Sequence, residues 1–229
     1  MPHLYLIPTP IAEPFALPEY LKDLRCFVVE NLREARRFLK WNFKDLDIDA
    51  CSFLEINKNA IDLKEIHTFL KNTLSQGLDI GLLSDAGVPC VADPGALVVE
   101  KAHELGFVVH PLVGPSSLLL ALMASGFNGQ TFAFHGYLPI PENEQIKKIK
   151  NLEEESARRD MTQLFIETPY RNTKLLQHLL GALKPETRLC VACDLGAINE
   201  EIVSKKVKDW KPEKHDFHKR PAVFLIYAC

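Results

Sequence analysis

The sequence lacks the glycine signatures of the best-known nucleotide-binding and hydrolytic folds. No G-x-G-x-x-G follows its first apolar run, and neither G-x-x-x-x-G-K-[ST] nor G-x-S-x-G occurs. The first absence argues against a Rossmann dinucleotide site, the second against a P-loop nucleotide triphosphatase, and the third against an α/β-hydrolase. A nucleotide-like ligand would therefore have to be held by loops of another kind.

Long apolar runs are also missing, since none reaches the roughly 18 to 20 residues that a membrane-spanning helix needs. The N-terminal stretch MPHLYLIPTP begins with a strand-like run and has no basic segment before it, which is unlike a signal peptide. With 47% hydrophobic residues, the chain has ample material for a core. A soluble, cytoplasmic protein is therefore expected.

An excess of positive charge is lacking too. The formal net charge is −3 and the isoelectric point is near 6.2, whereas proteins that bind nucleic acids usually carry a basic surface. Basic residues do cluster within residues 33–40, 205–208 and 211–220. Such runs are more often solvated faces than binding surfaces, so composition leaves a nucleic-acid partner open.

The pattern of cysteines and histidines does not favour a metal site. Cys190 and Cys193 form a C-x-x-C inside the strand-like run TRLCVACDL, and residues three apart on a strand point to opposite faces. His215 and His218 lie in a lysine-rich loop with no second ligand pair nearby. No metal is predicted, and the cysteines are expected to be reduced thiols.

Two stretches, residues 78–95 (LDIGLLSDAGVPCVADPG) and 107–117 (FVVHPLVGPSS), organise the chain. Each begins with an apolar run of buried-strand length and then breaks into glycine, proline, serine and aspartate. Residues 96–105 between them have helical spacing and end at a glycine. This order predicts parallel strands joined by helices, a sheet whose ligands gather at the carboxyl ends of its strands. The alternative is that residues 84–95 form only a tight turn at a strand end.

The same residues resemble a known family. The run LLSDAGVPCVADPG, followed by PLVGPSSLLLALMASGF and FHGYLP, is similar to the tetrapyrrole methylase superfamily of S-adenosylmethionine-dependent methyltransferases. Within it the likeness is greatest to the branch of ribosomal RNA small-subunit methyltransferase I, which reads roughly SDAGTPGISDPG, then PGPSA and FLP. LYLIPTPI, FIETPYR and VACDLGAINEE extend the resemblance over nearly the whole chain.

The resemblance implies an α/β fold of two domains with a donor cleft between them. The expected N-terminal domain, residues 1–114, holds a parallel sheet, and the C-terminal domain, residues 115–229, holds a mixed sheet in an α+β arrangement. In that second part the sequence predicts strands over residues 131–137, 161–167, 188–195, 201–207 and 222–227, with helices over 142–159 and 173–183.

The resemblance also implies S-adenosylmethionine as cofactor, a homodimer, and transfer to a ribose 2′-hydroxyl of ribosomal RNA. The expected donor contacts are Pro10, Ile11, Ser84, Asp85, Ala86, Gly87, Val88, Pro89, Ser116, Ser117, Glu167, Ala192, Cys193 and Asp194. A hydroxyl acceptor needs a base because its pKa is far above 7. The candidate catalytic residues are Glu30, Glu167, Arg171 and Glu200, with Glu201 as an alternative to Glu200.

Several positions depart from the family pattern. Where the family reads Ala-Glu-Asp-Thr-Arg, this chain keeps Glu30 and can offer Arg33, but the Asp-Thr pair is missing. Tyr170 replaces a histidine in ETPYR, and residues 196–199 replace the family's Thr-Lys-x-His. Three alternatives follow: Glu167 and Arg171 form only a structural ion pair, the acceptor is a small molecule such as a tetrapyrrole, or the protein binds the donor without turnover.

Overall fold

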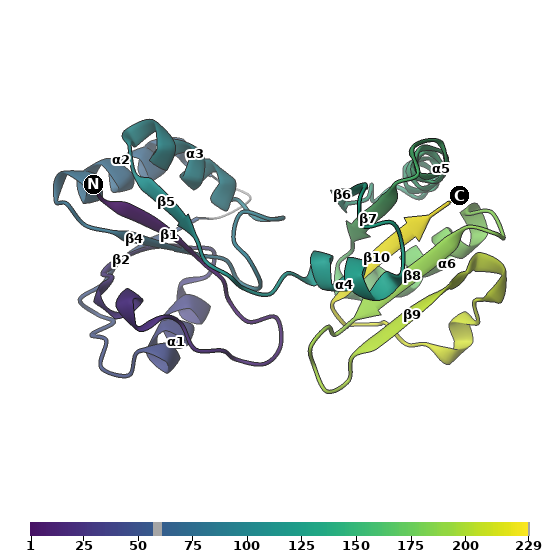
Figure 1. Cartoon of the computed structure of the whole chain (residues 1–229), viewed down its shortest axis with the longest axis horizontal. Helices are drawn as coiled ribbons and strands as arrows, with labels where there is room; N and C mark the ends of the chain where they lie inside the picture. Colours follow the sequence, from purple (N-terminus) through teal and green to yellow (C-terminus); the bar gives the residue numbers. More distant parts are fainter. Residues whose placement is uncertain (57–60, 229) are drawn as a thin grey trace. The chain divides into compact units, whose positions relative to one another are not determined.

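The computed structural model describes residues 1–56 and 61–228. The chain divides into two compact units, Met1–Ser116 and Ser117–Cys229, and each contains one five-stranded sheet (Figure 1). The boundary expected at residue 114 lies in the loop before Ser117, the residue at which the first helix of the second unit begins.

The first unit alternates strands and helices along the chain. Its elements are β1 (His3–Ile7), η1 (Glu19–Asp23), β2 (Cys26–Val29), α1 (Leu32–Asn42), β3 (Ser52–Glu55), α2 (Leu63–Ser75), β4 (Ile80–Leu83), α3 (Gly95–Leu105) and β5 (Val108–Pro111). The strands pair in the order β3-β2-β4-β1-β5, and every pairing is parallel. The parallel sheet predicted for this part of the chain is confirmed.

Helices cover both faces of this sheet, as Figure 1 shows. Apolar residues of α2 and α3, such as Ile66 and Val98, pack on one face against β1, β2 and β4. Ala35 and Leu39 of α1 pack on the other face with Phe27. Sheets buried on both faces need strands that are apolar throughout, and all four residues of β2 and of β4 are buried.

Local sequence signals explain where the helices begin and end. The Asn31 side chain accepts hydrogen bonds from the amides of Arg33 and Glu34 and so caps α1, and Asp62 caps α2 in the same way. Gly106 ends α3 in the left-handed conformation, with φ of 86°. β3 was not predicted from the sequence, because it is an edge strand in which Leu54 alone is buried.

The second unit contains a mixed sheet. Its elements are α4 (Ser117–Ser125), β6 (Phe132–Tyr137), α5 (Glu142–Arg159), β7 (Thr162–Ile166), η2 (Pro169–Arg171), α6 (Asn172–Ala182), β8 (Arg188–Cys193), β9 (Glu201–Lys206), η3 (Val207–Asp209), η4 (Pro212–Lys214) and β10 (Ala222–Tyr227). The strand order is β6-β7-β10-β8-β9, in which β6 and β7 are parallel and the remaining pairs are antiparallel. This confirms the predicted α+β arrangement.

The core of the second unit lies between the sheet and helices α5 and α6. Phe165 and Phe224 stack at a centroid distance of 6.1 Å and pack with Ile149 and Leu179 from the two helices.

Over residues 1–56 and 61–228, none of the helices combines the length and the apolar character that crossing a bilayer would require.

Candidate active site

The loops that follow β1 and β4 are bonded to each other. The amide of Thr9 donates to the carbonyl oxygen of Gly87 at 2.9 Å, and the amide of Gly87 donates back to Thr9 at 3.0 Å. Two hydroxyls reinforce this bridge: Thr9 Oγ1 donates to the Ser84 carbonyl at 3.1 Å, and Ser84 Oγ donates to the Gly87 carbonyl at 3.3 Å. The Ser84 side chain is thus buried, and its hydroxyl is used in a hydrogen bond within the loop.

Two glycines let the main chain of these loops approach closely. Gly87 has a φ of +79°, and a Cβ there would lie 3.3 Å from the carbonyl oxygen of Pro115. A Cβ on Gly114 would lie 2.1 Å from Cβ of Pro8. The carboxyl ends of β1, β4 and β5 therefore meet at one edge of the sheet, with no room for a side chain at Gly114 and a positive φ that favours glycine at position 87.

Glu30 ties the end of β2 to the same edge. Its Oε2 accepts the amide hydrogen of Asp85 at 2.9 Å, while the Asp85 residue itself is exposed. Glu30 therefore orients the loop that carries Asp85, and the carboxyl ends of four strands are linked at this edge.

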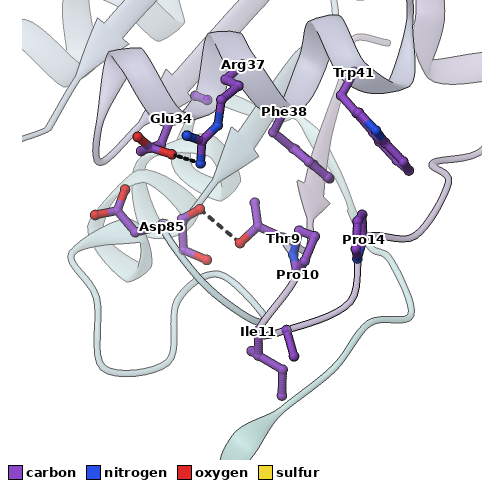
Figure 2. Close-up of a pocket in the computed structure, with 12 residues that line it drawn as sticks. Thr9, Pro10, Ile11, Pro14, Glu34, Arg37, Phe38, Trp41 and Asp85 are labelled. Carbon is purple, nitrogen blue, oxygen red and sulfur yellow. Dashed lines mark hydrogen bonds and ion pairs between the residues drawn. The ribbon is translucent and has the colours of Figure 1, made fainter. Parts of the chain in front are cut away.

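A pocket of about 380 Å³ lies between these loops and helix α1 (Figure 2). Four of the expected donor contacts, Pro10, Ile11, Ser84 and Asp85, line it. The other lining residues are Thr9, Ala12, Pro14, Glu34, Ala35, Arg37, Phe38 and Trp41. The α1 wall was not predicted from the sequence, because helical spacing identifies which face of α1 is buried but not what its other face adjoins.

The remainder of the β4 loop is held by Asp93. Its carboxylate accepts the amide hydrogens of Cys90, at 2.8 and 3.0 Å, and of Gly95 at 2.7 Å. These bonds support Cys90 and Ala92, two non-glycine residues with positive φ of 72° and 64°. Burial, with a smaller contribution from Asp93, raises the pKa of the Cys90 thiol to about 12, which favours the neutral form of this side chain.

In the second unit, Glu167 and Arg171 form an ion pair. Oε1 of Glu167 accepts from Nε of Arg171 at 2.9 Å, from its Nη2 at 2.6 Å and from the Thr168 amide at 2.5 Å. The Glu167 side chain is 2% exposed, whereas that of Arg171 is 34% exposed. The buried carboxylate thus orients a partly exposed guanidinium at the carboxyl end of β7.

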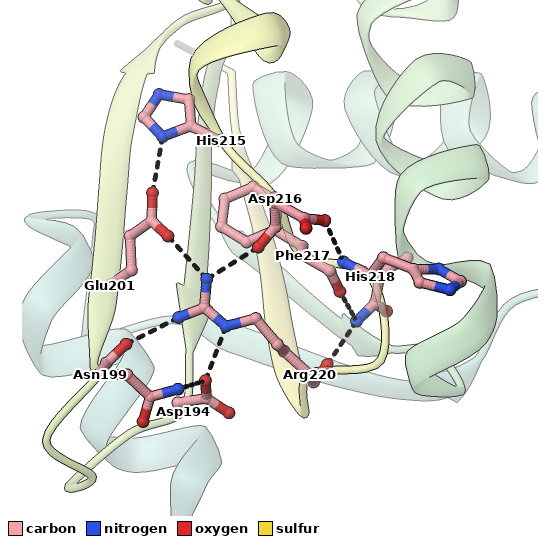
Figure 3. Close-up of polar contacts among 9 residues, drawn as sticks. Asp194, Asn199, Glu201, His215, Asp216, Phe217, His218 and Arg220 are labelled. Atoms are coloured by element: carbon pink, nitrogen blue, oxygen red, sulfur yellow. Dashed lines mark hydrogen bonds and ion pairs between the residues drawn. The ribbon is translucent and has the colours of Figure 1, made fainter.

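Arg220 holds together the loops at the end of β8 (Figure 3). Its guanidinium donates to Asp194 Oδ2 at 2.7 Å, to Glu201 Oε2 at 2.8 Å and to the carbonyls of Asn199 and Asp216 at 2.7 and 2.8 Å. These bonds, Asp194 first, raise the pKa of Arg220 although burial opposes the shift. Arg220 belongs to the basic run of residues 211–220, for which a solvated face was the favoured interpretation, but four acceptors surround its head group.

The other expected site residues near the end of β8 face inward or bond locally. Ala192 and Cys193 are buried within the sheet, whereas Asp194, which follows β8, is half-buried. Oε2 of Glu200 accepts from the Gly196 amide at 2.7 Å and closes the turn that replaces the family's Thr-Lys-x-His. Burial raises the pKa of the Cys193 thiol to about 11.

The remaining expected donor contacts lie in the loops themselves. Gly87 and Pro89 are buried in the β4 loop, Ala86 is exposed and Val88 is half-buried. Ser116 closes the first unit and Ser117 opens α4. In the described part of the chain, no group of three or more His, Cys, Asp or Glu side chains is placed to hold a metal ion.

Comparison with known proteins identifies the fold. No family model matches the sequence. Among solved structures, the methyltransferase CobJ aligns with a TM-score of 0.64 at 16% identity, covering 100% of this chain and 95% of CobJ. Uroporphyrin-III C-methyl transferase from Thermus thermophilus, complexed with S-adenyl homocysteine, aligns with a TM-score of 0.53 at 17% identity over 98% and 97% of the two chains. The predicted tetrapyrrole-methylase-like fold is confirmed.

Relatives with higher identity identify the family. Ribosomal RNA small subunit methyltransferase I of Vibrio cholerae is 30% identical over 99% of this chain and 77% of the relative. The protein of the same name from Bacillus subtilis is 31% identical over 90% of this chain and 68% of the relative. The chain therefore belongs to the ribosomal RNA small subunit methyltransferase I family.

Proposed function

We propose that this protein is an S-adenosylmethionine-dependent methyltransferase whose acceptor is a ribose 2′-hydroxyl of ribosomal RNA in the small subunit. The observation that carries the proposal is the 30% sequence identity to ribosomal RNA small subunit methyltransferase I of Vibrio cholerae, in an alignment that covers 99% of this chain. S-adenosylmethionine supplies an already activated methyl group, so the protein's task is to position donor and acceptor for in-line attack.

The edge formed by the β1, β4 and β5 loops fits this donor. Gly87, with its positive φ, and Gly114, where a side chain cannot fit, bring the main chain of these loops together. The exposed Asp85 carboxylate suits a ligand with positive sulfonium and ammonium groups. We assign donor contacts here to Pro10, Ile11, Ser116, Ser117 and residues 84–89. Glu167 and residues 192–194 are the proposed donor contacts of the second unit.

We assign different roles to the four candidate catalytic residues. Glu167 holds Arg171 through its Oε1 and is a positioning residue for that side chain, which is 34% exposed and is proposed to contact RNA. Glu30 positions Asp85 through the loop amide. Glu200 is exposed, and one of its carboxylate oxygens accepts a hydrogen bond from the Gly196 amide. Glu200 is therefore the proposed acceptor of the hydroxyl proton.

Methyl transfer to small-subunit particles tests the function directly. Purified protein is incubated with S-adenosylmethionine carrying a radiolabelled methyl group, and labelled nucleosides are identified after digestion of the RNA. A 2′-O-methylated nucleoside is the expected product, and Glu200→Gln is expected to slow its formation while leaving donor binding unchanged. If a small-molecule extract is labelled and the RNA is not, the acceptor is a small molecule. If calorimetry detects no binding of S-adenosylmethionine, the proposal that the protein is a methyltransferase is wrong.

We further propose that the protein acts as a homodimer in the cytoplasm, where small subunits are available as substrate. Leu119 and Met123 of α4 are 52% and 77% exposed, and exposed apolar residues of this size are typical of a subunit contact. Light scattering after size-exclusion chromatography is expected to give twice the chain mass of 25.9 kDa. A monomer at micromolar concentration would contradict this part of the proposal.

A further inference from the structure

One wall of the pocket in Figure 2 contains none of the residues that we assign to the donor. Helix α1 supplies this wall through Arg37, Phe38 and Trp41, and Pro14 lies beside Trp41. Trp41 is 52% exposed, although the other large apolar residues of this helix are buried or half-buried. A tryptophan left half in solvent at the mouth of a pocket offers a flat apolar surface to a ligand.

We infer that Trp41 is a stacking platform for an unpaired nucleobase of the RNA substrate. The inference rests on the proposed function, because it names how that substrate is held. Every base has a π-face, so an aromatic ring can hold a single-stranded nucleotide whatever its sequence. The volume of about 380 Å³ lies near the lower end of small-ligand pockets, which suits one nucleotide and excludes a folded RNA element.

The charge of α1 favours an RNA strand as the occupant. The helix carries Arg33, Arg36, Arg37 and Lys40 but only one acidic residue, Glu34. Arg33 and Arg37 are exposed, and Arg37 both lines the pocket and pairs with Glu34. A helix with this excess of basic residues attracts the phosphates of an RNA strand.

The position of the pocket suits the acceptor strand. Pro10, Ile11, Ser84 and Asp85 line it and are also proposed donor contacts. A nucleotide stacked on Trp41 therefore lies beside the loops assigned to the donor, as methyl transfer to its own ribose or to a neighbouring one requires.

Tryptophan fluorescence tests this inference without requiring turnover. The chain has two tryptophans. Trp210 is 7% exposed and donates its indole hydrogen to the Leu189 carbonyl at 3.2 Å, so it serves as a constant background. A short single-stranded oligocytidylate is expected to quench the emission of the wild-type protein and not that of Trp41→Phe. If the oligonucleotide quenches neither protein, or both equally, the inference is wrong.

The same measurement separates the two possible occupants. S-adenosylhomocysteine is expected to leave the Trp41 emission unchanged, whereas strong quenching by it and none by the oligonucleotide would assign the pocket to the donor's adenine and overturn the inference. If the oligonucleotide quenches the emission but the protein transfers no methyl group, the proposed function is wrong, whereas the role of Trp41 in stacking a nucleobase is supported.

Kinetics with small-subunit particles give a second readout. Trp41→Ala is expected to raise the KM for the particle on the order of tenfold, with kcat and donor affinity unchanged, because stacking contributes to RNA binding alone. Trp41→Phe should recover most of the loss. Tyr20→Ala, which removes an exposed aromatic outside the pocket, is the matched control. Equal effects of Trp41→Ala and Tyr20→Ala would contradict the role of Trp41.

Discussion

Arg220 donates its Nε hydrogen to Oδ2 of Asp194 at 2.7 Å, and this bond joins the turn that leads into β10 to the end of β8. Asp194 has a positive φ of 49°, which a residue with a side chain adopts only when its surroundings hold it there. Asn172 adds a second connection, since its amide nitrogen donates to the Arg220 carbonyl at 2.6 Å. Arg220 thus links the ends of β7 and β8, which carry the proposed site residues of the second unit.

Arg220→Ala is expected to lower the free energy of unfolding by about 2 to 3 kcal/mol, because it leaves the partly buried Asp194 and Glu201 carboxylates without their cation. Donor affinity should fall as well, since the turn after Asp194 loses its support. Chemical denaturation and calorimetry measure the two effects. Arg158→Ala, an exposed arginine of α5, is the control and should stay within about 0.5 kcal/mol of wild type.

Asp85→Ala is expected to weaken donor binding at least about tenfold and to leave folding intact. The reason is that the Asp85 side chain is exposed, while the bond that orders its loop runs from the Asp85 amide to Glu30 and survives the substitution. Calorimetry gives the affinity, and thermal unfolding monitored by circular dichroism gives the stability. A parallel loss of both would indicate that the loop only protects the end of β4. Asp45→Ala removes another exposed aspartate and should change neither quantity.

Sequence patterns predicted the bounds of strands and helices well where the apolar residues form a clear local pattern. α5 and β10 have the predicted bounds, because the local apolar pattern decides them. β3 was not predicted, since it gains its place from pairing with β2 and has little apolar pattern of its own. The α1 wall of the pocket and the role of Arg220 also depend on contacts distant in sequence, such as that between Arg220 and Asp194, which no local pattern encodes.

Gly114→Ala is expected to destabilise the first unit by about 2 kcal/mol or more, because its new Cβ would lie 2.1 Å from the Pro8 ring and would push the β1 and β5 loops apart. Donor affinity should fall with it. The matched control is Gly129→Ala, where nothing lies within 4 Å of the new Cβ. Denaturant titration distinguishes the two, and an unchanged midpoint for Gly114→Ala would show that the loops tolerate separation.

The Glu201 carboxylate makes stability depend on pH in the acid range. Burial alone would raise its pKa, but hydrogen bonds from His215 and Arg220 outweigh it and lower the pKa below the ordinary 4.5. A carboxylate whose pKa is lower in the folded state stabilises the fold above its unfolded pKa, and this contribution is lost as pH falls through the folded value.

Glu201→Gln should therefore be less stable than wild type at pH 7, and the difference should shrink once the pH drops below about 4.5, by at most about 1.4 kcal/mol per pH unit. Denaturant unfolding of both proteins from pH 7 to pH 3 measures the difference. Glu154→Gln, at an exposed position of α5, should show no such convergence with wild type. A constant gap between wild type and Glu201→Gln across this range would mean that the hydrogen bonds to Glu201 contribute through geometry and not through its charge.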